Sequence, residues 1–376
     1  METDAKRGLV KYAKPAGVIA SLIPMTNPAM TPPVTGVSSA NARNAVIFSP
    51  HPRTAATTCE MSRIMRAACH AVGAPEDLFQ CIERPSIPMT QYLMESCDLT
   101  LATGGKPMVQ AAYSSGKPAY GVGAGNSTIV VDETADLNEA AKNIMISKTS
   151  DFGSGCSADG NIVIQKSIYR NMVSELKANN GYLCNSAEKE LLSRVMWDDK
   201  ENRTFSTIAC KPQQLALVAG FEIPENIKFL MVENNGQIGK EHKFSKEKLT
   251  TLMALYYFEE FPDALNIIQK IYEVGGKGHS CGIYSTSDKN IDALARVAPV
   301  SRMMVRQPQS KSNAGSWTNG MPMTSSLGCG IWGGNITNEN VTMKHMMNYT
   351  WVSKPIQEDR PSERELFGEF FGQEVA

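Results

Sequence analysis

The alternation of short apolar runs with amphipathic stretches constrains the fold of this chain more than any other feature. Strand-like runs lie at residues 17–23, 45–48 and 99–102, and helix-like segments at 32–40 and 54–71 separate them. A helix between two strands returns the chain to the same edge of a sheet, so this order predicts parallel strands covered by helices. We therefore expect an α/β fold that begins with a Rossmann-type nucleotide-binding unit.

The alternation continues along the chain and indicates two units. A strand at 128–131 and a helix at 137–146 are predicted to complete the first unit. A strand at 161–165 then starts a second series after the polar, glycine-rich stretch 150–160. Residues 307–334 are rich in Gly, Ser, Asn and Pro, and this length without a pattern predicts a functional loop.

Charge and composition exclude several classes of protein. The net charge over 376 residues is -1, so no global field favours nucleic acid or an anionic membrane. The longest apolar runs are far too short to cross a bilayer. Nine cysteines without CxxC pairs, and a start that lacks a secretory signal, predict reduced thiols in the cytoplasm. His242 and His279 lack metal-ligand spacing, so no metal site is expected.

The letters of the dinucleotide fingerprint GxGxxG occur at residues 328–333. The fingerprint binds a pyrophosphate only where a strand turns directly into a helix, and polar or small residues flank this copy on both sides. The glycines at 121–125 lack the spacing of the third glycine and lead into a strand. Neither stretch is therefore expected to be a conventional phosphate loop.

Several blocks of the sequence resemble the aldehyde dehydrogenase superfamily, specifically its coenzyme A-acylating branch, which binds a dinucleotide without that fingerprint. The blocks fall in the family's order over nearly the whole chain: Pro-Met-Thr-Asn-Pro at 24–28, Arg-Asn-Ala-Val-Ile-Phe-Ser-Pro-His-Pro-Arg at 43–53, Ala-Thr-Gly-Gly at 102–105, Tyr-Ser-Ser-Gly-Lys-Pro at 113–118, Gly-Lys-Glu-His at 239–242, Gly-His-Ser at 278–280, and Leu-Gly-Cys-Gly-Ile-Trp-Gly-Gly-Asn at 327–335.

The resemblance assigns two catalytic residues. Cys156, with small neighbours that leave its sulfur accessible, matches the family's nucleophile, and Asn27 matches the amide that holds the oxyanion. The backbone N–H of Cys156 would be the second donor. Without the resemblance, Cys156 would be read as a small buried apolar residue and Asn27 as a turn residue before Pro28.

The resemblance also implies NAD or NADP as cofactor. The positions that it assigns to cofactor binding are Thr26, Ser49, Pro50, His51, Thr103, Gly104, Gly105, Gly121, Val122, Gly123 and Glu247. Glu247 would contact the nicotinamide ribose, and the alternative is a solvated charge on a helix. The absence of the lysine that hydrolytic relatives place near the adenine ribose, in the block Ser-Pro-His-Pro at 49–52, leaves the choice between NAD and NADP open.

Gly121 is the informative departure from hydrolytic relatives, which carry a glutamate there to activate water. Without that base the acyl-enzyme is expected to persist until a thiol attacks it, and coenzyme A is the thiol that the resemblance implies as co-substrate. His279 would then either assist deprotonation of coenzyme A or be a packed, hydrogen-bonded loop histidine.

Arg306 lies in the loop that faces the substrate in this family. The runs at 306–310 and 316–322 look like those of acylating enzymes that act on sulfoacetaldehyde, and a guanidinium suits the sulfonate of that aldehyde. Acetaldehyde and propionaldehyde remain alternative substrates, and Arg306 could instead form a surface or inter-domain ion pair. A non-catalytic scaffold subunit is the alternative outside enzymes.

The resemblance implies an architecture of three parts. A nucleotide domain covers 21–148 and a catalytic domain covers 149–338. The third part is for oligomerisation, in which an arm at 1–20 joins residues 340–358 of the C-terminal strand and tail at 339–376. A homodimer or homotetramer is expected. The helical region that precedes these blocks in full-length relatives is expected to be missing here, and no peptide that would target a bacterial microcompartment is seen. The protein is assigned to the cytoplasm, with a bacterial microcompartment as the alternative.

Overall fold

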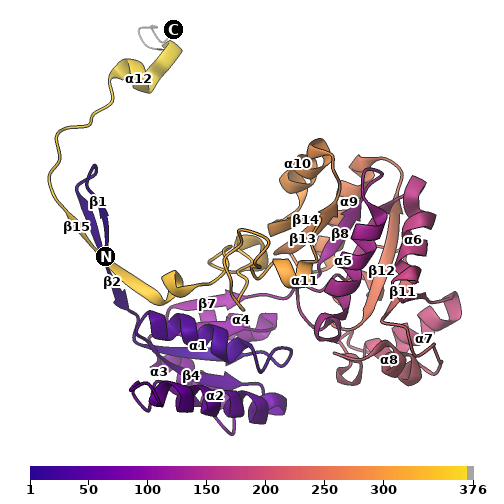
Figure 1. The fold of residues 1–376 in the computed structure, drawn as a ribbon, viewed down its shortest axis with the longest axis horizontal. Coiled ribbons are helices and arrows are strands. Elements are labelled where there is room, and N and C mark those ends of the chain that lie inside the picture. The colour runs from indigo at the N-terminus through magenta and orange to yellow at the C-terminus, as the bar shows by residue number, and fades with distance from the viewer. Residues whose placement is uncertain (371–376) are drawn as a thin grey trace.

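The computed structural model describes residues 1–370, which form three β-sheets and the helices that cover them (Figure 1). Two α/β units lie side by side, and a ribbon of antiparallel strands projects from the first unit. The predicted α/β fold with parallel sheets is confirmed.

The first unit is a five-stranded parallel sheet in the order β5-β4-β3-β6-β7. Its strands are β3 (Val18–Ile23), β4 (Ala45–Pro50), β5 (Phe79–Cys81), β6 (Leu99–Thr103) and β7 (Ala119–Val122), and its helices are α1 (Thr31–Asn41), α2 (Ala55–His70), α3 (Ile87–Ser96) and α4 (Lys106–Tyr113). From β3 the chain builds outward to β5 and then crosses to β6 on the other side. This reversal between β3 and β6 is a topological switch point, where open α/β sheets bind ligands at the carboxyl ends of their strands.

The second unit is a seven-stranded parallel sheet in the order β10-β11-β12-β9-β8-β13-β14. Its strands are β8 (Thr128–Val131), β9 (Asn161–Gln165), β10 (Gly181–Leu183), β11 (Phe229–Glu233), β12 (Leu252–Phe258), β13 (Gly278–Tyr284) and β14 (Val300–Val305). Its helices are α5 (Leu137–Thr149), α6 (Tyr169–Ala178), α7 (Ser186–Met196), α8 (Pro212–Ala219), α9 (Phe261–Val274) and α10 (Asp288–Val297). The runs of β8 and β9 are aliphatic and buried on both faces, which explains why these two strands lie in the interior of the sheet.

The strand and helix predicted to complete the first unit lie elsewhere. β8 pairs with β9 and β13 in the middle of the seven-stranded sheet, and α5 packs against α6. The chain thus passes from one sheet to the other at residues 123–127, not near 148. The strand-helix alternation is the same in both units, so it does not reveal which sheet a strand joins.

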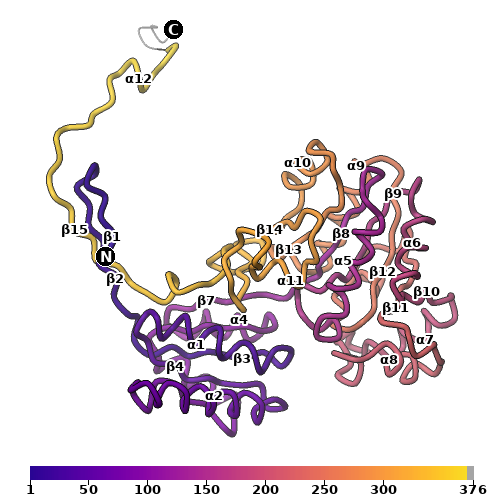
Figure 2. Tube along the Cα trace, viewed as in Figure 1, coloured from indigo at the N-terminus to yellow at the C-terminus, as the bar shows by residue number. Residues whose placement is uncertain are grey.

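The third sheet is a ribbon of β1 (Glu2–Asp4), β2 (Leu9–Pro15) and β15 (Met347–Ser353), in which β2 is central and antiparallel to both neighbours. We refer to these three strands as the flap. The predicted tail strand therefore has its partner in this chain. Beyond the flap the chain runs outward to α12 (Glu363–Phe367), away from both α/β units (Figure 2).

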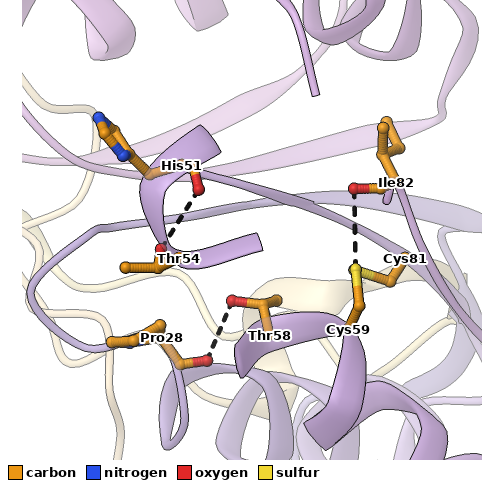
Figure 3. The surroundings of a disulfide bond; sticks show 7 residues. All are labelled: Pro28, His51, Thr54, Thr58, Cys59, Cys81 and Ile82. Atoms are coloured by element: carbon orange, nitrogen blue, oxygen red, sulfur yellow. Dashed lines mark hydrogen bonds between the residues drawn. A yellow bond between two sulfur atoms is a disulfide. The ribbon is translucent and has the colours of Figure 1, made fainter. Parts of the chain in front are cut away.

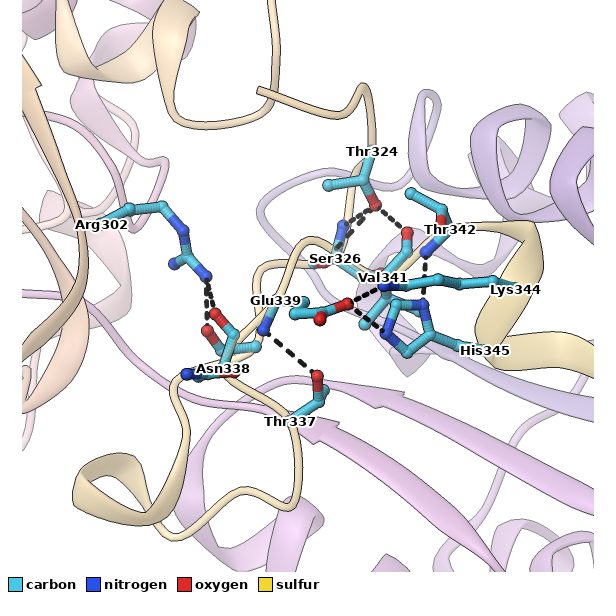
Figure 4. Close-up of polar contacts among 11 residues, drawn as sticks. Arg302, Thr324, Ser326, Thr337, Asn338, Glu339, Val341, Thr342, Lys344 and His345 are labelled. Atoms are coloured by element: carbon cyan, nitrogen blue, oxygen red, sulfur yellow. Dashed lines mark hydrogen bonds and ion pairs between the residues drawn. The ribbon is translucent and has the colours of Figure 1, made fainter. Parts of the chain in front are cut away.

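The segment between α11 (Gln309–Ser312) and β15 returns the chain to the first unit. Val341 and Met346 are buried in the core of that unit, and Asn44 Nδ2 donates a hydrogen bond of 2.9 Å to the Met346 carbonyl. Glu339 accepts from both Lys344 and His345 and so folds the segment on itself (Figure 4).

A disulfide joins Cys59 on α2 to Cys81 on β5 (Figure 3). The helix packs directly against this strand, which brings the two Cα atoms to 5.3 Å, within the range that a disulfide can bridge. The prediction that all thiols are reduced is therefore wrong for this pair. The other seven cysteines are free. Within the described part of the chain, every helix is too short or too polar to cross a lipid bilayer.

Candidate active site

A cavity of about 600 Å³ opens at the carboxyl edge of the five-stranded sheet. Ser49, Pro50 and His51, at the end of β4, line one side, and Pro107 and Met108 of α4 line another. The other predicted cofactor positions of this unit follow the neighbouring strands at the same edge: Thr26 after β3, Thr103, Gly104 and Gly105 at the end of β6, and Gly121, Val122 and Gly123 at the end of β7. The topology thus collects them where a nucleotide site is expected, and their contacts with a cofactor remain a prediction.

Cys156 and His279 lie against each other in the second unit. The Cys156 sulfur is 3.0 Å from Nε2 of His279, which lies on β13 and is fully buried. The prediction of a loop histidine is wrong, because the residue lies within a strand. A buried imidazole in contact with the predicted nucleophile has the geometry of a general base.

Two glycines let the backbone pass close to the Cys156 loop. A Cβ atom at Gly125 would lie 1.9 Å from the Cys156 carbonyl oxygen. At Gly153 a Cβ would lie 2.5 Å from the Thr250 carbonyl, and its φ of +70° is a conformation that favours glycine. Larger residues at either position would displace the loop that carries Cys156.

Both members of the Cys156–His279 pair are neutral at rest. Burial, followed by the nearby Glu247 and Cys329, raises the pKa of the Cys156 thiol to about 12, and the Arg302 guanidinium opposes this shift. Burial, followed by the charge of Arg302, lowers the pKa of His279 to about 3. Proton transfer between them must therefore accompany attack of the sulfur, rather than precede it as a stable ion pair.

Arg302 on β14 holds the walls of the site together. Nη1 donates a hydrogen bond of 3.0 Å to the His279 carbonyl, and Nη2 donates to the carbonyls of Gly328 and Asn338 (Figure 4). The guanidinium thus fixes β13 relative to the loop around Cys329 and supplies positive charge near the thiol. Sequence reasoning missed this residue, since a single arginine in a strand carries no local signal.

Glu247 lies in the loop that leads to β12, which excludes the alternative of a solvated helix charge. Burial raises the pKa of its carboxyl group to about 8, while the Gly125 N–H and the cations Lys148, Arg203 and Lys248 oppose the shift. Its Oε1 atom is buried without a hydrogen-bond partner. An unpaired buried oxygen is well suited to accept from a ribose hydroxyl.

The position where hydrolytic relatives carry a glutamate is filled by other side chains. A Cβ atom at Gly121 would lie 2.4 Å from Cγ1 of Val109 and 2.9 Å from the hydroxyl oxygen of Tyr113. That hydroxyl also accepts hydrogen bonds from the N–H groups of Gly121 and Ile336. The site therefore has neither the carboxylate nor the room for one.

The roles predicted for Asn27 and Arg306 stay predictions, and the structure gives the positions of the two residues. The Asn27 carbonyl accepts from the Thr31 N–H at the start of α1, as a turn residue would, and its oxyanion role stays a prediction. Arg306 is exposed at the end of β14. It follows Arg302 by four residues, which is about 13 Å of extended strand.

As predicted, the GxGxxG stretch at 328–333 is not a turn between a strand and an α-helix. The stretch lies in the segment beyond α11, and its last three residues form a single 3-10 turn. Among residues 1–370, no group of three or more His, Cys, Asp or Glu side chains could hold a metal ion.

Comparison with known proteins adds independent findings. A family model described as "Aldehyde dehydrogenase family" matches residues 1–183. A sulfoacetaldehyde dehydrogenase from Acholeplasma sp is 42% identical over 374 residues, which are 98% of this chain and 77% of that protein. The structure of an acetylating aldehyde dehydrogenase from Geobacillus thermoglucosidasius matches with a TM-score of 0.92 at 37% identity, covering 96% of this chain and 80% of that one. A propionaldehyde dehydrogenase from Rhodopseudomonas palustris, solved with bound CoA and an acylated cysteine, matches with a TM-score of 0.83 at 26% identity, covering 92% of this chain and 77% of that one.

Proposed function

Because the chain belongs to the aldehyde dehydrogenase family, in its coenzyme A-acylating branch, we propose that it oxidises sulfoacetaldehyde with NAD(P)+ and transfers the acyl group to coenzyme A through a thioester on Cys156. The observation that carries the proposal is the contact of 3.0 Å between the Cys156 sulfur and Nε2 of His279. A thiol becomes a nucleophile only as it loses its proton, and Nε2 of His279 is near enough to accept the proton of Cys156.

The first half-reaction forms the thioester. The Cys156 sulfur attacks the aldehyde carbon while its proton passes to Nε2 of His279, and the resulting oxyanion is assigned to the side chain of Asn27 and the N–H of Cys156. A bound nicotinamide supplies the hydride acceptor. His279 then releases its proton to solvent, which accounts for the one proton that the overall reaction produces.

The second half-reaction transfers the acyl group. His279 takes the proton of the incoming coenzyme A thiol, and the new thiolate attacks the acyl carbon. The bond from that carbon to the Cys156 sulfur then breaks, and the departing sulfur recovers a proton from His279. Gly121 supports thiol over water as the acceptor, because no carboxylate fits beside it to activate water. The relative solved with CoA and an acylated cysteine supports the same order of events.

Residues of both units fit a nicotinamide dinucleotide. The cavity at Ser49–His51 would take the adenosine half, and the unpaired Oε1 of Glu247 would accept from the nicotinamide ribose. No carboxylate is among the described residues that line the cavity. Dinucleotide sites that prefer NAD usually present an acidic residue to the ribose 2′-hydroxyl, so this lining admits NADP as well.

The choice of an anionic aldehyde rests on Arg306 and on the sulfoacetaldehyde dehydrogenase relative. An exposed guanidinium can turn toward a sulfonate at the mouth of a site and form two charge-assisted hydrogen bonds with it. Neutral aldehydes such as propionaldehyde gain nothing from that charge. A solved relative acts on propionaldehyde by its description, so a neutral substrate is the alternative.

The test is a kinetic matrix with the purified chain. Sulfoacetaldehyde, succinic semialdehyde and propionaldehyde are each supplied with NAD+ or NADP+, with and without coenzyme A, and both NAD(P)H and the acyl product are measured. We expect the highest kcat/KM with sulfoacetaldehyde, acyl-coenzyme A as product, and an acyl adduct on Cys156 when coenzyme A is withheld. Free acid as the main product would contradict acyl transfer.

Variants separate the chemical role from the substrate role. Cys156→Ser should abolish NAD(P)H formation with every aldehyde, because an alkoxide is scarcely populated near neutral pH. Asn27→Ala should lower kcat about a hundredfold through loss of an oxyanion donor.

Arg306→Ala should lower kcat/KM for sulfoacetaldehyde about tenfold or more and leave kcat/KM for propionaldehyde unchanged. Equal losses for both aldehydes would show that Arg306 supports the loop and not the sulfonate.

A further inference from the structure

Four hydrogen bonds connect the two ring nitrogens of His279 to Cys156, one directly to its sulfur and three in series to its carbonyl. On one side of the ring, Nε2 faces the Cys156 sulfur at 3.0 Å. On the other side, Nδ1 lies 2.9 Å from the Ser280 hydroxyl, which lies 3.1 Å from the Ser127 hydroxyl. Ser127 in turn donates to the Cys156 carbonyl at 3.2 Å. The path begins and ends on the same residue.

The direction of each proton in this chain follows from the carbonyl at its end. A carbonyl oxygen can only accept, so the single hydroxyl proton of Ser127 is committed to Cys156. The Ser127 oxygen then accepts from the Ser280 hydroxyl, whose own proton is thereby also committed. The Ser280 oxygen can meet Nδ1 of His279 only as an acceptor, and Nδ1 must carry the ring proton.

Burial makes this order the stable one. Ser280 and His279 are fully buried and Ser127 is 1% exposed, so water cannot replace a missing partner for any of them. In the reverse order Nε2 would carry the proton and the Cys156 carbonyl would lose its donor. A ring with Nε2–H would then point a proton at the thiol and could not act as base.

The backbone of residues 279 and 280 is fixed from both sides of the strand. Arg302 Nη1 donates to the His279 carbonyl at 3.0 Å, and the Tyr272 hydroxyl donates to the Ser280 carbonyl at 2.7 Å. The ring and the Ser280 hydroxyl therefore cannot drift apart to relax the network.

We propose that Ser280 and Ser127 are positioning residues that hold His279 as the Nδ1–H tautomer, so that the Nε2 lone pair faces the Cys156 thiol and, later, the thiol of coenzyme A. This inference rests on the proposed role of His279 as base. Neither serine touches the reacting atoms. They act by deciding which nitrogen of the ring is free to accept a proton.

The tautomer is measured directly by nitrogen NMR on the full chain labelled with 15N-histidine. Five histidines give few signals, and His279→Gln identifies the one that belongs to the site by its loss. We expect a neutral ring with the Nδ1–H pattern in the parent at pH 7.5, and a mixture or the Nε2–H pattern in Ser280→Ala. An Nε2–H pattern or an imidazolium in the parent overturns the proposal. This readout needs no substrate, so it stands apart from the test of the proposed function.

Kinetics supply the second arm. Ser280→Ala should lower kcat for acyl transfer about 10- to 100-fold with little change in KM for coenzyme A, as expected when the general base is held in the wrong tautomer. Ser127→Ala should lower kcat less, because Ser280 can still accept from Nδ1. Ser285 is a buried serine just beyond β13 that takes no part in these four hydrogen bonds. Ser285→Ala is therefore the matched control and should keep parent activity. If both variants are as active as the control, the serines do not position the ring.

Should Ser280→Ala fail to fold, the parent spectrum and the Ser127→Ala variant still decide the question. The parent spectrum must show Nδ1–H, and Ser127→Ala must retain the fold by thermal melting while losing kcat. A parent ring with the other tautomer, or Ser127→Ala with full kcat, rejects the proposal.

Discussion

At the scale of single residues, the site pairs a protonated thiol with a neutral imidazole. Each group is held neutral by burial, which raises the pKa of Cys156 to about 12 and lowers that of His279 to about 3. If Cys156 is the nucleophile, as we propose, this arrangement keeps its thiol unreactive until an aldehyde lies within reach. This protects the thiol from adventitious electrophiles.

Alkylation of Cys156 should reveal this latency. Because the pKa of the thiol is about 12, labelling by iodoacetamide should rise about tenfold per pH unit from pH 7 to 9 without reaching a plateau. The rate is followed by mass spectrometry of the peptide that contains Cys156, with glutathione in the same tube as reference. A plateau below pH 8 would show a preformed thiolate–imidazolium pair and contradict the neutral resting state.

Gly121 gives a second prediction at this scale. Gly121→Glu should not create a hydrolase, because the new side chain would meet Val109 and Tyr113 within 3 Å. We expect a loss of about 1–3 kcal/mol in unfolding free energy from overpacking, and no increase in free acid released from the acyl-enzyme. Gly275→Glu is the control, since a Cβ there meets no atom within 4 Å. Rapid acid release by Gly121→Glu would show that the pocket adapts to hold the base.

At the scale of elements, the disulfide between α2 and β5 ties a surface helix to the edge strand of the five-stranded sheet. The two cysteines are 22 residues apart, so the bond closes a loop of moderate size. Such a crosslink acts mainly by limiting the freedom of the unfolded chain. It lies on the flank of the sheet, and neither cysteine lines the cavity at the carboxyl edge of that sheet.

Removing the crosslink should lower stability only under oxidising conditions. Cys59→Ser should reduce the unfolding free energy by about 3 kcal/mol without reductant, and the difference should vanish when reductant is present. Cys69→Ser, a free cysteine on the same helix, serves as control. Thiol titration of the denatured, unreduced chain should count seven free thiols of the nine. A count of nine would show that the bond does not form in solution.

At the scale of the whole molecule, the flap stands apart from both α/β units (Figure 1). Tyr349 and Trp351 on β15 are 38% and 56% exposed, and alternate positions of a strand point to the same face. Aromatic side chains on an edge strand are suited to contact with a second copy of the chain. The role of the flap in oligomerisation remains a prediction from the family resemblance.

Charge placed on the flap should break the assembly. We expect a dimer or tetramer for the parent by light scattering after size exclusion, and a smaller mass for the double variant Tyr349→Glu, Trp351→Glu, because buried carboxylates without partners oppose association. Val72→Glu, which is exposed at the end of α2, should leave the mass unchanged. An unaltered mass for the double variant would place the subunit contact elsewhere.

The sequence by itself determined the elements and the parallel α/β class, because hydrophobic periodicity and breaker residues act within windows of a few residues. It also singled out Cys156, Asn27 and the cofactor positions through motifs that resemble the family. These signals are local, so they survive without knowledge of the packing.

Only the tertiary structure decided which distant residues meet. β8 joined the seven-stranded sheet, Arg302 closed the walls of the site, and Cys59 reached Cys81. His279 met Cys156 across 123 residues of sequence, and the space at Gly121 was filled by Val109 and Tyr113. Each of these outcomes depends on how whole strands and helices pack, and no short window of sequence contains both partners together with the geometry that joins them.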